Sequence, residues 1–298
     1  MEKKEKDWEG VTGGSTFGQK ALKILFSIVN VRVGYFILIF IIPFYMLFAR
    51  KGYLAIMRYF RRQHGYSPIK SFWKTYVNHY MFGQMLMDRF AVYAGRKNIF
   101  KVDNPDNDMF LSLLNAPGGF IMATSHVGNA ELCGYLLRQN KKRINGLIFG
   151  GEAKEVQANR MKISEENNMR LIPVSNDLSH IFVINEALSN GEILNIPGDR
   201  VFGSEKSIEC DFLNGKADFP IGAFVLAAQF RVPVLAYFVL KVSASCYRVH
   251  LALIPVPETK APKREQINDM TRTFVGELEK VVRTYPEQWF NFYNFWKE

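Results

Sequence analysis

The segment Phe120–Tyr135 reads FIMATSHVGNAELCGY, and the interpretation of the whole chain starts from it. An apolar run after a Pro-Gly-Gly sequence predicts a buried strand, Ser125–Gly128 predict a turn, and Asn129 predicts the start of a helix. This order puts His126 at the carboxyl end of a strand. Ligands and chemistry gather at that end of the strands in open α/β sheets.

His126 and Glu131 are five positions apart. On one continuous helix they would lie about 140° apart and could not touch, at ~100° per residue. If His126 lies in the turn before the helix, the carboxylate can accept the ring N–H and leave the other nitrogen free as a base. The sequence therefore predicts a catalytic pair in which Glu131 orients His126.

The sequence SHVGNAE within this segment resembles the H-x4-[D/E] signature of the glycerolipid and lysophospholipid acyltransferase superfamily. Its Gly-Asn pair resembles the branch that contains the late acyltransferases of lipid A biosynthesis. On this motif alone, an incidental histidine before a helix remains an alternative, because five histidines and 28 acidic residues make a chance match easy.

The segment Ile193–Gly203, ILNIPGDRVFG, repeats this pattern: an apolar strand ends in Pro-Gly and is followed by Asp199 and Arg200. The guanidinium of Arg200 is a fixed fork of donors suited to a phosphate or a carboxylate, and Asp199 can orient that fork or the catalytic pair. A structural turn with a surface ion pair is the alternative from these residues alone.

Three later blocks strengthen the resemblance, because they occur in the order of the lipid A type acyltransferases: Phe212–Ala223, Val232–Val234 and Pro286–Trp296. The Gly-Asp-Arg sequence, the aromatic final block and the opening Trp8–Gly18 resemble a sister branch associated with aryl polyene and flexirubin pigment synthesis. The resemblance implies that four residues bind substrate: Asn129, Asn159, Asp199 and Arg200.

The composition of the 298 residues limits the class of protein. With 48% hydrophobic and 14% aromatic residues, the chain is not disordered. Its net charge of +10 indicates an anionic partner: a nucleic acid, an anionic membrane surface or an acidic protein. The three cysteines are scattered and form no C-x-x-C pair, so we expect no disulfide framework, no zinc site and a reducing, cytoplasmic location. We also expect no other metal and no cofactor.

An uncharged apolar run extends over Val33–Ala49, and basic and aromatic residues follow it over Arg50–Arg62. The run is near the lower limit for a membrane span of about 20 residues. Together the two stretches favour an interfacial membrane anchor over nucleic-acid binding, with a buried helix of a soluble protein as the alternative. We expect a membrane-associating segment at 1–65 and one catalytic domain at 66–298.

Strand-like and helix-like runs alternate after the central segment, which predicts an α/β fold with a mainly parallel or mixed sheet flanked by helices. The last two expected strands can form a hairpin at the edge of the sheet. The expected strands are Gly146–Phe149, Arg170–Val174, Glu192–Ile196, Val232–Leu240 and Arg248–Val256, and the expected helices are Ser67–Val102, Asn104–Asn115, Glu152–Glu166, Leu178–Ser189 and Ile221–Phe230.

The resemblance implies an O-acyltransferase on the cytoplasmic face of a bacterial inner membrane. Its donor would be an acyl thioester, on acyl carrier protein rather than coenzyme A, and its acceptor a lipid hydroxyl on a lipid A precursor, a lysolipid or a pigment lipid. His126 would act as general base for direct attack, and the lack of a G-x-S-x-G elbow agrees with this. A hydrolase using the same pair and a non-catalytic, basic membrane-binding protein remain alternatives.

Overall fold

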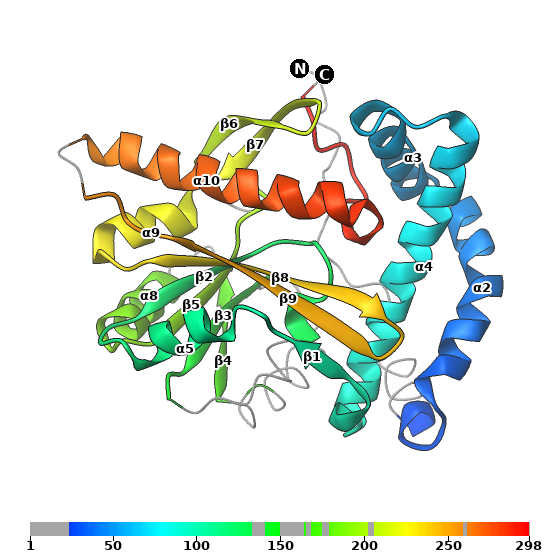
Figure 1. The fold of residues 1–298 in the computed structure, drawn as a ribbon, viewed down its shortest axis with the longest axis horizontal. Coiled ribbons are helices and arrows are strands. Elements are labelled where there is room, and N and C mark those ends of the chain that lie inside the picture. The colour runs from blue at the N-terminus through cyan, green and yellow to red at the C-terminus, as the bar shows by residue number, and fades with distance from the viewer. Residues whose placement is uncertain are drawn as a thin grey trace.

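The computed structural model describes residues 24–132, 141–149, 164, 168–174, 179–201, 206–258 and 261–297. These residues form a seven-stranded sheet in the order β1-β9-β8-β2-β5-β3-β4 (Figure 1). The five strands from β8 to β4 run parallel, β9 is antiparallel to β8, and β1 is parallel to β9. The strands are β1 (Lys101–Asp103), β2 (Phe120–Thr124), β3 (Ile144–Phe149), β4 (Met169–Val174), β5 (Ile193–Pro197), β8 (Val234–Ser243) and β9 (Cys246–Ile254). The predicted mixed α/β sheet is confirmed.

Strand β2 lies inside the sheet, and all five of its residues are buried. Because side chains alternate along a strand, Phe120 and Met122 enter one core, while Ile121 and Ala123 enter the other. Helices pack on both sides, as parallel sheets require. The core of Phe120 includes α4 (Pro68–Tyr93) and α5 (Asn107–Asn115), and the core of Ile121 includes α8 (Ser179–Ser189), α9 (Gly222–Phe230) and α10 (Lys263–Thr284).

The N-terminal helices form a layer beside α4. Helix α2 (Val31–Phe48) lies on the outer side of α4, away from the sheet, and α3 (Arg50–Arg58) and the π-helical turn Tyr59–Gln63 follow it (Figure 1). The buried face of α2 has helical spacing and consists of Val31, Gly34, Tyr35, Leu38, Ile42 and Met46. Among the described residues, α2 is the one helix long and apolar enough to cross a membrane.

The two cores connect the N-terminal helices to the sheet. Val31 and Tyr35 of α2 belong to the core of Phe120, and Ile56, Tyr59 and Phe60 belong to the core of Ile121. The segment before residue 66 therefore shares its packing with the rest of the chain. The domain boundary at residue 65 stays a prediction.

Several elements differ from the expectation. Strands β8 and β9 form the expected hairpin, but β1 pairs with the outer side of β9, so the hairpin is not at the edge of the sheet. The helix expected over Ser67–Val102 ends at Tyr93. The sequence did not predict β1, the antiparallel pair β6 (Ser207–Phe212) and β7 (Gly215–Pro220), or α10. The helix expected at Glu152–Glu166 lies almost wholly outside the described residues.

The predicted turn after β2 is confirmed, and Gly128 fixes it against β8. Gly128 has a φ of +66°, and a Cβ built there would lie 1.9 Å from the carbonyl oxygen of Val239. The next peptide donates its N–H, from Asn129, to the same oxygen at 2.7 Å. Only glycine allows both the positive φ and this close backbone approach.

Gly128→Ala is expected to destabilise the fold by more than about 2 kcal/mol, because it combines a left-handed backbone with a clash against β8. The measurement is the unfolding midpoint of the purified protein in detergent. Gly276→Ala is the matched control, since a Cβ at Gly276 in α10 meets nothing within 4 Å. A glycine to alanine change inside a helix should be neutral or stabilising by up to about 1 kcal/mol. Equal midpoints for the two variants would contradict this account of the turn.

Candidate active site

The pairing of β2 with β5 brings two turns together. These neighbouring strands are parallel and in register, so that Thr124 and Pro197, their last residues, lie opposite each other. The Gly198 N–H donates to the Thr124 carbonyl oxygen at 2.7 Å and continues the ladder into the turns. His126 and Asp199 each follow two residues after their strand ends, so the register places them side by side.

Asp199 binds His126 through both carboxylate oxygens. Oδ2 accepts the backbone N–H of His126 at 2.7 Å, and Oδ1 lies 2.8 Å from the ring nitrogen Nδ1. The side chain of Asp199 is 1% exposed, whereas that of His126 is 36% exposed. One carboxylate therefore fixes both the backbone and the ring of a histidine whose side chain is partly exposed.

The ionisation of Asp199 determines which ring nitrogen carries the proton. Burial acts to raise the pKa of Asp199, but the charge and hydrogen bonds of His126 and the nearby charge of Arg200 outweigh it and hold the pKa below its usual range. An ionised carboxylate only accepts hydrogen bonds, so Nδ1 must carry the hydrogen. In the neutral imidazole, Nε2 then has a free lone pair and can act as a base.

The C-terminal segment forms the other side of the site. The Gly128 N–H donates to the Gln288 carbonyl oxygen at 2.8 Å, and the Phe290 N–H donates to the His126 carbonyl oxygen at 2.9 Å. Arg200 donates from Nη2 to the Phe290 carbonyl oxygen at 2.7 Å, and its guanidinium lies 5.5 Å from the ring centre of Tyr293. Burial lowers the pKa of Arg200 from its usual value. Arg200 thus lies beside His126 and Asp199, as the sequence predicted.

The contact predicted between His126 and Glu131 is not present, and Asp199 holds Nδ1 instead. The two carboxylate oxygens of Glu131 bind residues of α4: Arg89, in an ion pair, and the Tyr93 hydroxyl, at 2.7 Å. Glu131 lies in the first turn of the helix that begins at residue 130. From that turn its side chain meets a guanidinium, which is a stronger partner than a neutral imidazole.

Asn129 is predicted to bind substrate, but the structure gives it another task. It is 5% exposed, its Oδ1 accepts the Leu132 N–H at 3.4 Å, and its Nδ2 donates to the Met85 carbonyl oxygen at 3.2 Å. These contacts make Asn129 the cap of the helix that begins at residue 130 and an anchor of that helix on α4. Asn159, the remaining residue predicted to bind substrate, lies outside the described residues.

The site thus consists of an oriented imidazole at the carboxyl ends of two central parallel strands, with an arginine beside it. Such a histidine is arranged to accept a proton from a bound nucleophile. Within the described part of the chain, no three His, Cys, Asp or Glu side chains gather as a metal site.

A family model described as bacterial lipid A biosynthesis acyltransferase matches residues 80–298. The chain belongs to this family. It is therefore an acyltransferase of lipid biosynthesis, and both turns of the site and the C-terminal segment lie inside the matched region.

The chain also has a distant likeness to solved structures, of which we report one. It is the crystal structure of the 1-acyl-sn-glycerophosphate (LPA) acyltransferase, PlsC, from Thermotoga maritima, with 11% sequence identity and a TM-score of 0.35, covering 87% of this chain and 97% of that one. The curated proteins contain no significant match.

Sequence reasoning identified the two turns of this acyltransferase but missed the residues that hold them. Gln288 and Phe290 lie in the Pro286–Trp296 block, which indicated the family without indicating a contact. Arg89 and Tyr93 sit on an aromatic-rich helix that was interpreted as core. Asp199 itself was expected to orient either Arg200 or the catalytic pair, and the structure places its carboxylate on the ring of His126.

Asp199→Asn is expected to lower the rate of acyl transfer by about 10²- to 10⁴-fold, because an amide cannot accept both His126 hydrogens and leaves the ring without its orienting charge. Glu131→Gln should cost less, since it leaves Nδ1 and its partner in place. The measurement is turnover of both purified variants at saturating donor, with unfolding midpoints as the control for folding. A larger loss in Glu131→Gln would show that Glu131 reaches the imidazole once substrate is bound.

Proposed function

We propose that the protein transfers a fatty acyl chain from a thioester to a hydroxyl of a lipid acceptor, with His126 as the general base. The observation that carries the proposal is the imidazole of His126, one third exposed, with Nδ1 held by the buried carboxylate of Asp199. Such a ring presents Nε2 to a bound hydroxyl. The family gives the reaction class, and this geometry supports His126 as the base.

The reaction proceeds by direct attack. Nε2 of His126 takes the proton of the acceptor hydroxyl as its oxygen bonds to the thioester carbonyl carbon. The tetrahedral intermediate then expels the thiolate, and the imidazolium returns the proton to sulfur, so that an ester and a thiol leave. Asp199 stabilises the imidazolium throughout, as a buried carboxylate does in hydrolytic triads.

Glu131 acts in this scheme as a positioning residue. Its bonds to Arg89 and Tyr93 hold the start of the helix after the turn against α4. Arg200 is suited to a phosphate or carboxylate of the donor or the acceptor, because its guanidinium stands beside the base.

The donor is an acyl carrier protein thioester in preference to coenzyme A. The net charge of +10 complements an acidic carrier, and it also suits anionic lipid headgroups. For the acceptor, the Gly-Asp-Arg sequence of the second turn supports a pigment lipid alongside a lipid A precursor or a lysolipid.

Helix α2 attaches the enzyme to the cytoplasmic face of the inner membrane. The face of α2 that is turned away from α4 is apolar, and Phe36, Phe40 and Phe44 on it are each about 60% exposed. Leu47 and Phe48 extend this surface to the start of α3, where Arg50 and Lys51 are exposed. An apolar helix face that ends in exposed cations fits the boundary between acyl chains and anionic headgroups.

His126→Ala is expected to cut turnover by about 10²- to 10⁴-fold while the KM for the donor changes little, since a base contributes to the chemical step. The assay follows labelled acyl groups from carrier-protein and coenzyme A thioesters into extracted lipids. Labelled free fatty acid in place of acyl lipid would identify a hydrolase. Undiminished acyl transfer by His126→Ala would refute His126 as the base. The absence of any turnover by the wild-type protein would favour a non-catalytic membrane protein.

Replacing Phe36, Phe40 and Phe44 together by serine is expected to weaken binding to anionic phospholipid vesicles on the order of 100-fold, since each side chain loses roughly 1 kcal/mol or more of apolar burial. Vesicle sedimentation measures the partition. Leu111→Ser on α5, which is 40% exposed, is the control and should bind like wild type. Unchanged partition of the triple variant would exclude α2 as the attachment surface.

A further inference from the structure

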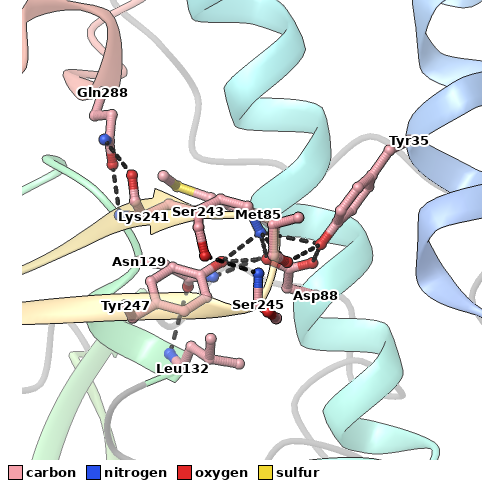
Figure 2. Close-up of polar contacts among 11 residues, drawn as sticks. Tyr35, Met85, Asp88, Asn129, Leu132, Lys241, Ser243, Ser245, Tyr247 and Gln288 are labelled. Atoms are coloured by element: carbon pink, nitrogen blue, oxygen red, sulfur yellow. Dashed lines mark hydrogen bonds and ion pairs between the residues drawn. The ribbon is translucent and has the colours of Figure 1, made fainter. Parts of the chain in front are cut away.

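A buried cluster of four polar side chains lies where α2, α4 and the β8–β9 hairpin meet (Figure 2). Asp88 of α4 and Tyr247 of β9 are fully buried, and Lys241 of β8 and Tyr35 of α2 are each 5% exposed. Lys241 continues the alternation of Leu235, Tyr237 and Val239, so its side chain enters the core that contains α4. The reaction proposed above uses none of the four.

Asp88 is the centre of this cluster. Its carboxylate forms an ion pair with Lys241 and accepts the hydroxyls of Tyr35 and Tyr247. Lys241 also donates to the Tyr35 hydroxyl at 3.0 Å, and its ammonium lies 4.8 and 5.0 Å from the ring centres of Tyr35 and Tyr247. Helix α2 is thus tied to α4 and to both strands of the hairpin by one set of bonds.

An ion pair in this position is costly. Burial raises the pKa of Asp88 and lowers the pKa of Lys241, so each charge depends on its partner. Replacing a buried ion pair by apolar residues of similar volume is often neutral or stabilising, whereas removing one partner is strongly destabilising. Stability alone therefore gives no reason for the pair, and its directional bonds suit a role in alignment.

Two routes connect the cluster to the turn that carries His126. In the first, the side chain of Asn129, which caps the helix after the turn, lies beside the Tyr247 hydroxyl and acts to lower the pKa of that hydroxyl, which burial raises overall (Figure 2). In the second, Gln288 holds the peptide groups of Lys241: its Oε1 accepts the Lys241 N–H at 2.8 Å and its Nε2 donates to the Lys241 carbonyl oxygen at 2.9 Å.

Gln288 completes the second route through its own backbone. Its carbonyl oxygen accepts the Gly128 N–H, and the next residues pair with the turn through Val127 and His126. The position of Lys241 is therefore linked to the position of the turn by short hydrogen bonds. Both routes start from side chains that bind Asp88, and Tyr35 joins α2 to the same carboxylate.

We propose that Tyr35, Asp88, Lys241 and Tyr247 form a positioning network that aligns the His126 turn with helix α2. The position of α2, the helix proposed to bind the membrane, then sets the rate of acyl transfer. The inference rests on the proposed reaction at His126. It makes α2 a part of the active-site framework as well as an attachment surface.

The test uses the full chain in phospholipid nanodiscs and two single-atom deletions, Tyr35→Phe and Tyr247→Phe. Tyr76→Phe is the matched control, because the Tyr76 hydroxyl of α4 also donates to α2, at the Ile39 carbonyl oxygen 3.2 Å away, but does not touch the network. The double variant Asp88→Leu with Lys241→Met removes the ion pair at similar volume. The readouts are kcat, the KM for the thioester, the unfolding midpoint and the ¹⁵N-histidine N–H resonance of the His126–Asp199 bond, assigned with His126→Ala.

Tyr35→Phe and Tyr247→Phe are expected to lower kcat by about 10-fold, since each removes a hydrogen bond to a charged group, with the KM for the thioester unchanged. They should also shift or broaden the His126 resonance. Tyr76→Phe should leave kcat within about 2-fold of the wild-type value and the His126 resonance unshifted, although it also removes a hydrogen bond between α2 and α4. The double variant, if it folds, should keep its midpoint and lose kcat.

A lower unfolding midpoint in Tyr35→Phe and Tyr247→Phe with wild-type kcat and an unshifted resonance would reduce the cluster to a structural role and overturn the proposal. Equal effects of Tyr35→Phe and Tyr76→Phe on kcat would also overturn the proposal, because any loosening of α2 would then be enough to lower kcat. If wild type shows no acyl transfer, the proposed function fails. The resonance then still decides whether the network aligns His126.

Discussion

The active site depends on the parallel pairing of β2 with β5. Each strand ends in a turn and presents a polar side chain two residues later, but only the register of the pair brings His126 to Asp199. A shift of one residue would reverse the sides to which the residues of β2 point and remove Phe120 and Met122 from their core. The burial of β2 on both faces therefore specifies the register, and through it the position of His126 beside Asp199.

The turn after β2 is held mainly by peptide groups, which suits a site that must keep its shape during proton transfer. Val239 of β8 binds it on one side and the Gln288–Phe290 segment on the other, while Asp199 binds the backbone N–H of His126 from the end of β5. Backbone contacts of this kind fix position more firmly than exposed side chains, which lose rotamer freedom when they bind. The imidazole is then oriented by a single buried carboxylate.

The sequence was sufficient for the elements that carry the candidate site but not for their long-range partners. Apolar runs that end in glycine, proline or asparagine located β2, β5 and the turn, because these are local signals. The choice between Glu131 and Asp199 depended on Arg89 and Tyr93, about forty positions upstream, and on the order of the strands, neither of which leaves a local pattern. Helix α10 was missed although its buried residues have helical spacing, because its charged face dilutes that pattern.

The backbone bonds between the His126 turn and Gln288–Phe290 also set an order of events during synthesis. Strand β2 and α2 leave the ribosome early, whereas the segment that closes the turn follows at about 5–20 residues per second, a delay on the order of 10 s. During that interval the turn that carries His126 still lacks one side of its support. With the attachment proposed for α2, the nascent chain therefore has its membrane-binding helix before the candidate active site is complete.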